Sequence, residues 1–448
     1  MKKITLLIAL FLGLQWAAFS QGCLPGTTYF TSQAEVDAFQ TNYPNCTQIE
    51  GSIVINGSDI TNLNGFSHIT SIGENLYITS ASSLTNLIGL DALTTIGGFF
   101  YLSVDTSLVS LSGIGSLTSV NGGLSIYKTS LRSLAELSSL TYIGGNFEII
   151  KNNSLPNLIG LEGLTEINKD LEISENDSLV SMETLIGITT VEEDLYLSNN
   201  PLLINLTGLE QLTSVGGNVT IMQNHRLDNL SELGSLTTIG GGLSIIQNNK
   251  LQSVNGLNSL ASIGGALSIS YNYVIVDLTA LSSLTSIGGS LLIKNNFILP
   301  SLVGLGQINP ATIDAIEIVN NGFLTLCEVQ SVCDYIATPD AVVDIANNDT
   351  GCEYLTQVEL ACQLANEPEF VFSNFYSIYP VPAHNQLYIT TRKNAVIGEV
   401  TLFNEFGQKV FAIRTESNVM DVSMLATGFY IIEIQNAGIK LREKLIIK

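Results

Sequence analysis

The residues that could carry reaction chemistry are few and scattered in this 448-residue chain. Its histidines are His68, His225 and His384, which fall in different parts of the sequence. This distribution does not favour a histidine-centred triad or a zinc site, and the chain has no G-x-S-x-G, H-E-x-x-H or phosphate-binding motif. Carboxylate pairs could in principle hydrolyse glycosides, but this is the weakest alternative. We therefore expect no catalytic residue, no enzyme activity and no metal or other cofactor.

The six cysteines are more informative, because their positions flank the middle of the chain. They are Cys23, Cys46, Cys327, Cys333, Cys352 and Cys362. An even number of cysteines predicts disulfides where the chain is exported, which the N-terminal residues described below indicate. Two precede a long repetitive segment and four follow it, so we expect them to brace its two ends, with Cys23 paired to Cys46. The last four cysteines could pair in three ways.

A repeat of about 24 residues fills the segment between these cysteines. Its consensus is roughly L-x-x-L-x-G-L-x-x-L-T-x-I-G-G-x-L-x-I-x-x-N. The leading aliphatic residue recurs in steps of 24, 24, 23, seven times 24, and 25, at Ile60, Leu84, Leu108, Leu131, Leu155, Leu179, Leu203, Leu227, Leu251, Ile275, Leu299 and Leu324. One such unit cannot bury its apolar face alone, but stacked units can. The repeat thus predicts a solenoid of about 11 turns, roughly 50 Å long at ~4.8 Å per strand.

Three parts of the repeat have separate expected roles. The L-x-I element alternates with period two, which predicts a short strand whose Leu and Ile point inward. The preceding Gly-Gly, as at Gly97-Gly98, predicts a corner where glycine adopts positive φ. An asparagine follows each of the later strands, and we expect an internal ladder that satisfies buried backbone groups rather than a row of ligand-binding amides. This ladder comprises Asn152, Asn176, Asn200, Asn224, Asn248, Asn272, Asn296 and Asn321.

Residues between the inward-pointing Leu and Ile should form an outer face. Tyr101, Tyr127 and Tyr196 are the best candidates for ligand contacts, because exposed aromatic side chains on a rigid sheet anchor partners well. Glu148 and Glu172, together with Asp170 and Asp194, should cluster on adjacent turns. Such a cluster could hold calcium or meet a basic partner, although a solvated acidic strip is favoured over a metal site.

The charge of the chain is strongly uneven. Its formal net charge is −23. Residues 1–22 hold two basic and no acidic residues and residues 371–448 hold eight basic and six acidic, which leaves seven basic and thirty-four acidic residues in 23–370. Nucleic-acid affinity depends on cationic side chains, so we expect no nucleic-acid partner. We interpret the acidity mainly as a contribution to solubility.

The first residues are typical of a signal peptide. Lys2 and Lys3 precede an apolar run, and Ala18 and Ser20 have the spacing of a cleavage site after residue 20. That run is too short to cross a bilayer, and we expect no transmembrane segment elsewhere. A lipid-modified Cys23 is an alternative that the preceding residues fit poorly.

The repetitive segment resembles the leucine-rich repeat family and, more closely, its receptor L-domain variety. The resemblance rests on CTQIEGSIVI from Cys46 and on the recurring L-T-x-I-G-G-x-L-x-I, over residues 46–325. It implies a right-handed solenoid that binds a protein or another ligand. The array is longer and more regular than a typical receptor L domain, so no specific ligand is transferred.

The last part of the chain changes in composition and shows strand-like alternation typical of a small β-sandwich. It resembles the C-terminal sorting domain of the type IX secretion system of Bacteroidota. The matching features are Tyr379-Pro380 with Pro382-Ala383, Gly407-Gln408, Leu425, Gly428-Phe429-Tyr430 and the basic aliphatic end Lys444–Lys448, while Val381 replaces the usual Asn. The resemblance implies export by the type IX machinery, removal of the tail and, often, anchoring to surface polysaccharide.

Together these features predict a mainly β protein that is secreted or displayed at the cell surface. The expected parts are a signal peptide (1–20), an N-terminal cap (21–52), a solenoid (53–325), a cysteine-containing cap (326–363), a linker (364–372) and a sorting domain (373–448). We expect a non-catalytic protein that binds or adheres to an unknown protein or glycan. A structural surface-layer protein without a specific ligand is the alternative.

Overall fold

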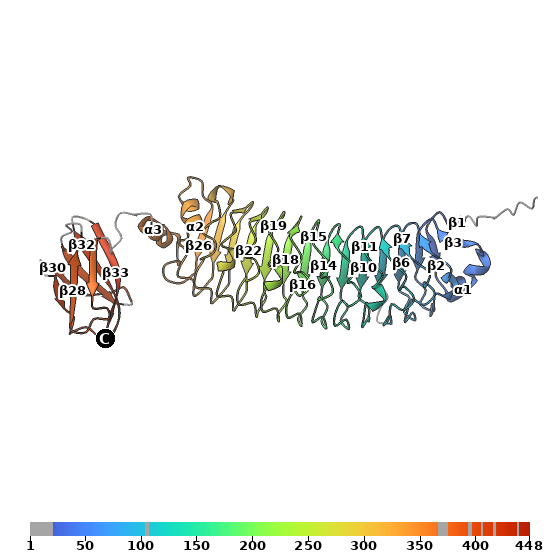
Figure 1. Ribbon diagram of the computed structural model, residues 1–448, viewed down its shortest axis with the longest axis horizontal. Coiled ribbons are helices and arrows are strands. Elements are labelled where there is room, and N and C mark those ends of the chain that lie inside the picture. The colour runs from blue at the N-terminus through green and yellow to red at the C-terminus, as the bar shows by residue number, and fades with distance from the viewer. Residues whose placement is uncertain are drawn as a thin grey trace, which may run out of the picture. The chain divides into compact units, whose positions relative to one another are not determined.

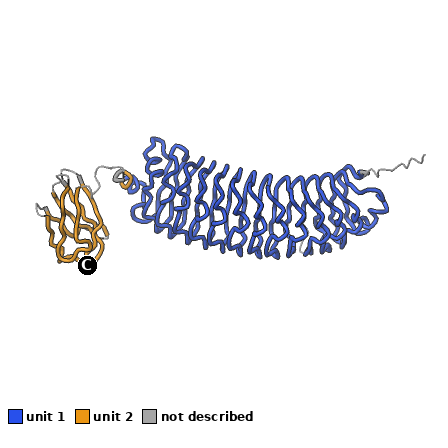
Figure 2. The backbone as a smooth tube through the Cα atoms, in the orientation of Figure 1, with its two compact units in different colours: residues 1–359 blue, residues 360–448 orange. Residues whose placement is uncertain are grey.

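The computed structural model describes residues 21–103, 107–365, 375–392, 397–404, 406–414, 418–436 and 439–448. The chain divides into two compact units, residues 1–359 and 360–448 (Figure 2). The expected signal peptide and most of the expected linker 364–372 lie outside the described residues. No helix in the described ranges is both long enough and apolar enough to span a membrane.

The first unit is a parallel β-solenoid in which each turn adds one strand to a 14-stranded sheet, the major sheet (Figure 1). In spatial order its strands are β2 (Thr28–Phe30), β4 (Ile53–Ile55), β6 (Leu76–Thr79), β8 (Phe100–Ser103), β10 (Leu124–Tyr127), β12 (Phe147–Ile150), β14 (Leu171–Ser174), β16 (Leu195–Ser198), β18 (Val219–Met222), β20 (Leu243–Ile246), β22 (Leu267–Ser270), β24 (Leu291–Lys294), β25 (Ile316–Val319) and β26 (Val343–Ala346). The predicted fold class is confirmed. The solenoid has about 13 turns rather than 11, because the caps contribute strands at both ends.

A second side of the turns carries a short strand, which within the repeat is two residues long and is formed by the T-x-I part; the two strands before the repeat are longer. These strands make two 6-stranded minor sheets. The first contains β1 (Gln21–Cys23), β3 (Cys46–Ile49), β5 (Ser71–Ile72), β7 (Thr95–Ile96), β9 (Ser119–Val120) and β11 (Tyr142–Ile143). The second contains β13 (Glu166–Ile167), β15 (Thr190–Val191), β17 (Ser214–Val215), β19 (Thr238–Ile239), β21 (Ser262–Ile263) and β23 (Ser286–Ile287). At the break between them, the Asn168 side chain donates to the Ile143 carbonyl over 3.1 Å.

The core runs the length of the solenoid. All twelve leading aliphatic residues of the repeat are fully buried, as are the Leu and Ile of nearly every L-x-I strand. Burying each such side chain stabilises the fold by about 1.5–3 kcal/mol relative to exposure. Short 3₁₀ helices complete some turns: η1 (Asn64–Phe66), η2 (Ala135–Leu137), η3 (Ser231–Leu233), η4 (Thr279–Leu281) and η5 (Pro310–Thr312).

The eight repeat asparagines are completely buried and link successive turns. In a typical rung, Asn200 Nδ2 donates to the Ile173 carbonyl over 2.8 Å, and its Oδ1 accepts the Asn176 backbone N–H over 3.1 Å. The ladder begins at Thr129, which donates to Asn152 Oδ1, and extends past the repeat to Asn348. Buried backbone groups that the turning chain cannot pair internally are thereby satisfied, and the turns are held in register.

The expected role of the Gly-Gly pair was wrong. Gly97 and Gly240 do not have positive φ; a Cβ at either would lie 2.0 Å from the carbonyl oxygen of the preceding turn. Glycine is needed there because adjacent turns approach closely. Positive φ occurs instead at the glycine of the L-x-G-L element, such as Gly89, and at the residue before each ladder asparagine, such as Lys151.

The N-terminal end is closed by α1 (Gln33–Asn42). Ser32 caps this helix by accepting from the Glu35 N–H. Phe39 of α1 packs against Phe30 and Phe66, with ring centroids 5.8 Å and 4.9 Å away, so aromatic side chains cover the otherwise open core. The predicted Cys23–Cys46 disulfide is present and joins β1 to β3.

The last turn of the solenoid carries α2 (Gln330–Ile336), which contacts η5 of the preceding turn, and α3 (Leu355–Ala365) follows the last strand β26. Of the three pairings left open by the sequence, the structure has Cys327 bonded to Cys352. Cys333 and Cys362 are also in disulfide form, so both ends of the solenoid are braced as expected.

The second unit contains two antiparallel sheets. One has the order β27 (Tyr376–Tyr379), β28 (Gln386–Thr391), β31 (Val419–Asp421), and the other β30 (Lys409–Arg414), β29 (Glu399–Asn404), β32 (Gly428–Asn436), β33 (Ile439–Ile447). Leu387, Val400 and Ile432 are among the buried residues of its core. Ala383 bridges to the last strand, since its N–H donates to Ile446 and its carbonyl accepts from Lys448.

Candidate functional site

The outer face of the major sheet presents one side chain per turn in strict register. Tyr77 of β6 pairs with Tyr101 of β8, and their ring centroids lie 6.3 Å apart. Tyr101 in turn pairs with Ser125 of β10. The residues on either side of each tyrosine in its strand are buried on the core face, whereas Tyr77 and Tyr101 are half-buried and point outward. The face therefore holds its side chains on a rigid frame.

Tyr127 lies on the next strand, two residues along from Ser125, and is likewise half-buried. The Lys151 ammonium sits 5.6 Å from the centroid of its ring, within the range of a cation–π interaction. The same ammonium is 3.4 Å from a Glu175 carboxylate oxygen. This hydrogen bond and the nearby Glu175 charge raise the pKa of Lys151. The ion pair is substantially exposed, so its contribution to stability is small.

Two glutamates directly oppose each other beside this aromatic group. Glu148 of β12 and Glu172 of β14 are register partners on adjacent strands, and Glu172 is followed by Tyr196 of β16. Glu172 Oε1 accepts from the Ser174 hydroxyl over 2.6 Å, and Glu148 Oε1 accepts from the Asn146 amide over 3.4 Å. The five predicted contact residues thus lie on one face. Tyr101 and Tyr127 are neighbours, whereas Tyr196 is three strands beyond Tyr127, or about 14 Å at the usual strand spacing.

The two aspartates expected in the acidic cluster have a different role. Asp170 Oδ1 accepts the Asp194 backbone N–H over 2.9 Å, and Asp194 Oδ1 accepts the Asn218 N–H over 2.6 Å. Asn218 and Asn75 repeat this contact to Gly242 and Phe99 of the following turns. These side chains form a second, outer polar ladder. In the described ranges, no group of three or more His, Cys, Asp or Glu side chains is placed to hold a metal ion.

One aromatic residue of this face was missed by sequence reasoning. Tyr29 of β2 is 60% exposed and aligns through Val54 with Tyr77, so it extends the same column to the N-terminal cap. The alternating T-Y-F segment was the available signal, but it stands outside the 24-residue repeat. We call the outward-facing residues Tyr29, Tyr77, Tyr101, Tyr127, Glu148, Glu172 and Tyr196 the aromatic–acidic face.

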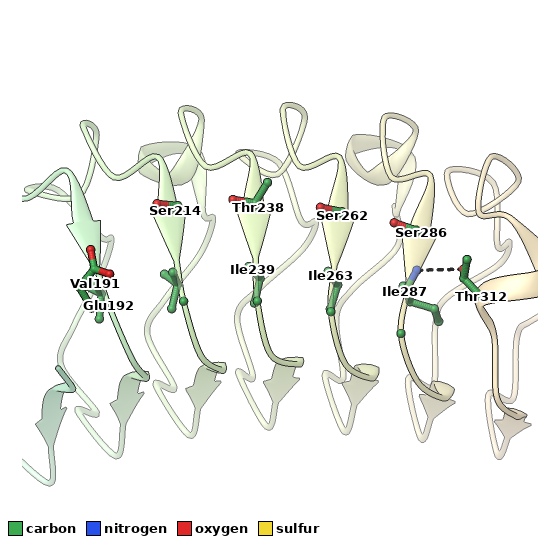
Figure 3. Close-up of a pocket in the computed structure, with 15 residues that line it drawn as sticks. Val191, Glu192, Ser214, Thr238, Ile239, Ser262, Ile263, Ser286, Ile287 and Thr312 are labelled. Atoms are coloured by element: carbon green, nitrogen blue, oxygen red, sulfur yellow. Dashed lines mark hydrogen bonds between the residues drawn. The ribbon is translucent and has the colours of Figure 1, made fainter. Parts of the chain in front are cut away.

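A separate shallow trough of about 550 Å³ runs along the second minor sheet (Figure 3). Its lining includes a column of hydroxyls and a column of glycines, one of each per turn: Ser214, Thr238, Ser262 and Ser286, and Gly216, Gly240, Gly264 and Gly288. Buried Val and Ile residues lie between the two columns. Glu192 brings the one carboxylate of this lining, and none of the predicted contact residues is part of it.

Two parts of the chain match known families. Residues 45–112 match the receptor L domain, and residues 377–448 match the secretion system C-terminal sorting domain. No curated protein matches the chain significantly. The receptor L-domain match spans the strands that carry Tyr77 and Tyr101.

The sorting-domain match establishes where the protein goes. It covers the second unit from β27 to the last residue and includes the Ala383 contact with the final strand. The chain carries a type IX sorting tail, which implies handling by that secretion machinery, export and attachment at the cell surface.

Proposed function

We propose that the protein is a non-catalytic surface adhesin or receptor that binds a protein or glycan partner through the aromatic–acidic face. The supporting observation is the in-register pair of half-buried tyrosines, Tyr77 and Tyr101, on a continuous parallel sheet whose same column also carries Tyr196. Tyr77 and Tyr101 are half-buried and their rings lie against each other, so binding would immobilise few additional side-chain rotamers. Aromatic side chains held in this way are the type that dominates binding energy at interfaces.

The receptor L-domain match supports the same function, because it coincides with the N-terminal part of this column. The sorting tail supports it independently, since a binding surface is useful where the exported protein can meet partners. Nothing in the face resembles a reaction centre: its carboxylates contact neighbouring side chains, and no histidine lies on it.

The test is a protein and glycan array screen with the purified full-length chain, followed by a saturation titration of each hit. Tyr101→Ala should weaken binding at least about 5-fold, the minimum loss for an interface residue worth ~1 kcal/mol. Tyr142→Ala is the matched control, because Tyr142 is 45% exposed but belongs to a minor sheet. No saturable ligand, or equal loss in both variants, would contradict the proposal, and the former result would favour a purely structural surface-layer protein.

A further inference from the structure

The aromatic–acidic face carries an uncompensated like-charge pair. Glu148 and Glu172 are direct register partners on adjacent strands. In the ranges that the structure describes, no lysine or arginine forms an ion pair with either one. Like charges placed directly opposite each other destabilise a sheet. The face therefore retains an electrostatic strain that a cation from outside would relieve.

Aromatic rings flank this pair on both sides. Tyr196 is the register partner of Glu172 on the following strand. Tyr127 lies on the strand before Glu148 and is diagonal to it, two residues beyond its register partner Ser125. One of these rings already binds a cation within the chain. The Lys151 ammonium lies over the Tyr127 ring and forms an ion pair with Glu175. Among the described residues, no such cation sits over Tyr101 or Tyr196. Ring faces and carboxylates together are the groups that recognise guanidinium and ammonium ions.

Glu148 and Glu172 form the carboxylate pair of this column that has no ion-pair partner among the described residues. Farther along, the same column continues with the uncharged Thr220, Ser244 and Ser268. Its next carboxylate, Glu317, is the register partner of the exposed Asp344, and this second pair is compensated because Lys294 lies 2.5 Å from Glu317. The net charge of −27 over residues 23–370 adds a long-range attraction for cations and repels uronate or sulfate groups. Charge complementarity thus favours a positively charged occupant, and polypeptides carry such charge far more commonly than polysaccharides.

We infer that the partner bound by the aromatic–acidic face is a protein, and that it presents an extended segment containing Arg or Lys. The cations of this segment meet Glu148 and Glu172, and its backbone or aliphatic stems lie against Tyr101, Tyr127 and Tyr196. This inference rests on the proposed function, because it names the chemistry of the partner for the same face.

The experiment measures binding of a fluorescein-labelled arginine–serine repeat peptide to the purified full-length chain by anisotropy. The face variant is Glu148→Gln with Glu172→Gln. The matched control is Glu166→Gln with Glu192→Gln, which removes the same charge from two exposed positions elsewhere on the solenoid. At ~0.2–1 kcal/mol per lost ion pair, the face variant should weaken binding about 2- to 30-fold and the control by less. Raising the salt concentration should weaken wild-type binding.

Equal weakening by the face variant and the control would overturn the inference, because the peptide would then report only the general acidity of the chain. So would a ligand from the array screen that needs Tyr101, carries no positive charge and binds the face variant as tightly as wild type. That last result would leave the proposed function intact. Absence of any saturable ligand in the screen and of face-specific peptide binding would refute both.

Discussion

Replacing Asn152 by Ala should destabilise the solenoid through lost hydrogen bonds rather than lost packing alone. Asn152 is fully buried, and its Nδ2 donates to the Ile126 carbonyl over 2.8 Å. Its Oδ1 accepts the Thr129 backbone N–H over 3.1 Å and the Thr129 hydroxyl over 2.7 Å. The substitution removes the partner of two buried backbone groups at about 1–3 kcal/mol each, which predicts a loss of roughly 2–6 kcal/mol.

The neighbouring Asn153→Ala is the matched control, because this side chain is exposed. It should change the free energy of unfolding by less than about 0.5 kcal/mol. Guanidinium unfolding followed by far-ultraviolet circular dichroism gives the two free-energy differences. Hydrogen exchange measured by mass spectrometry should show lost protection around β10 and β12 before distant turns, since a solenoid transmits stability between nearest neighbours. A difference below ~0.5 kcal/mol between the two variants would refute the account of the ladder.

Two further predictions concern close approach and charge. Gly240→Ala should lower the free energy of unfolding by about 1–3 kcal/mol, because the new Cβ would lie 2.0 Å from a backbone carbonyl oxygen of the preceding turn. Gly115→Ala is the control, since the nearest atom there is 3.3 Å away and belongs to a flexible side chain. Equal melting temperatures for the two variants would contradict this prediction. Burial alone would raise the pKa of Glu433, but its bonds to a neighbouring arginine and lysine outweigh burial and hold that pKa below the ordinary value of 4.5. The stabilisation of the second unit by the charged Glu433 is therefore complete above pH 4.5 and is lost as pH falls through the lower folded-state pKa. Lowering the pH should accordingly reduce the denaturant concentration at the unfolding midpoint of this unit more steeply in the wild type than in Glu433→Gln.

The sequence was sufficient to predict the solenoid and its register, because each L-x-I strand repeats at a nearly constant interval and must face the core. Neighbour relations on the outer face follow directly, which is why Glu148 and Glu172 were placed on adjacent turns correctly. The end strands were not predicted. β2 and β26 belong to caps that have their own sequences, so no periodic signal extends to them.

Other features depend on distances that a residue type does not encode. Glycine can serve positive φ or close approach, and only the contact of Gly240 with the preceding turn decides between them. The residue before each ladder asparagine has positive φ, but residues as different as Lys151, Gln223 and Tyr271 occupy this position. The residue type therefore does not reveal the conformation. Asp170 has the chemistry of a ligand carboxylate, but its partner is a backbone N–H of the next turn.

The asparagine ladder also has a consequence for how such a chain changes length. From Asn176 to Asn296, each junction between turns is made by the same donor and acceptor at the same 24-residue interval. After an in-frame duplication or deletion of one interval, every remaining junction between turns has the same donor and acceptor as before, and the caps are unaffected. Unequal recombination within the gene can therefore lengthen or shorten the displayed surface in steps of one strand spacing, about 4.8 Å, without redesigning the core. The length of the solenoid can therefore change by heritable steps of one turn.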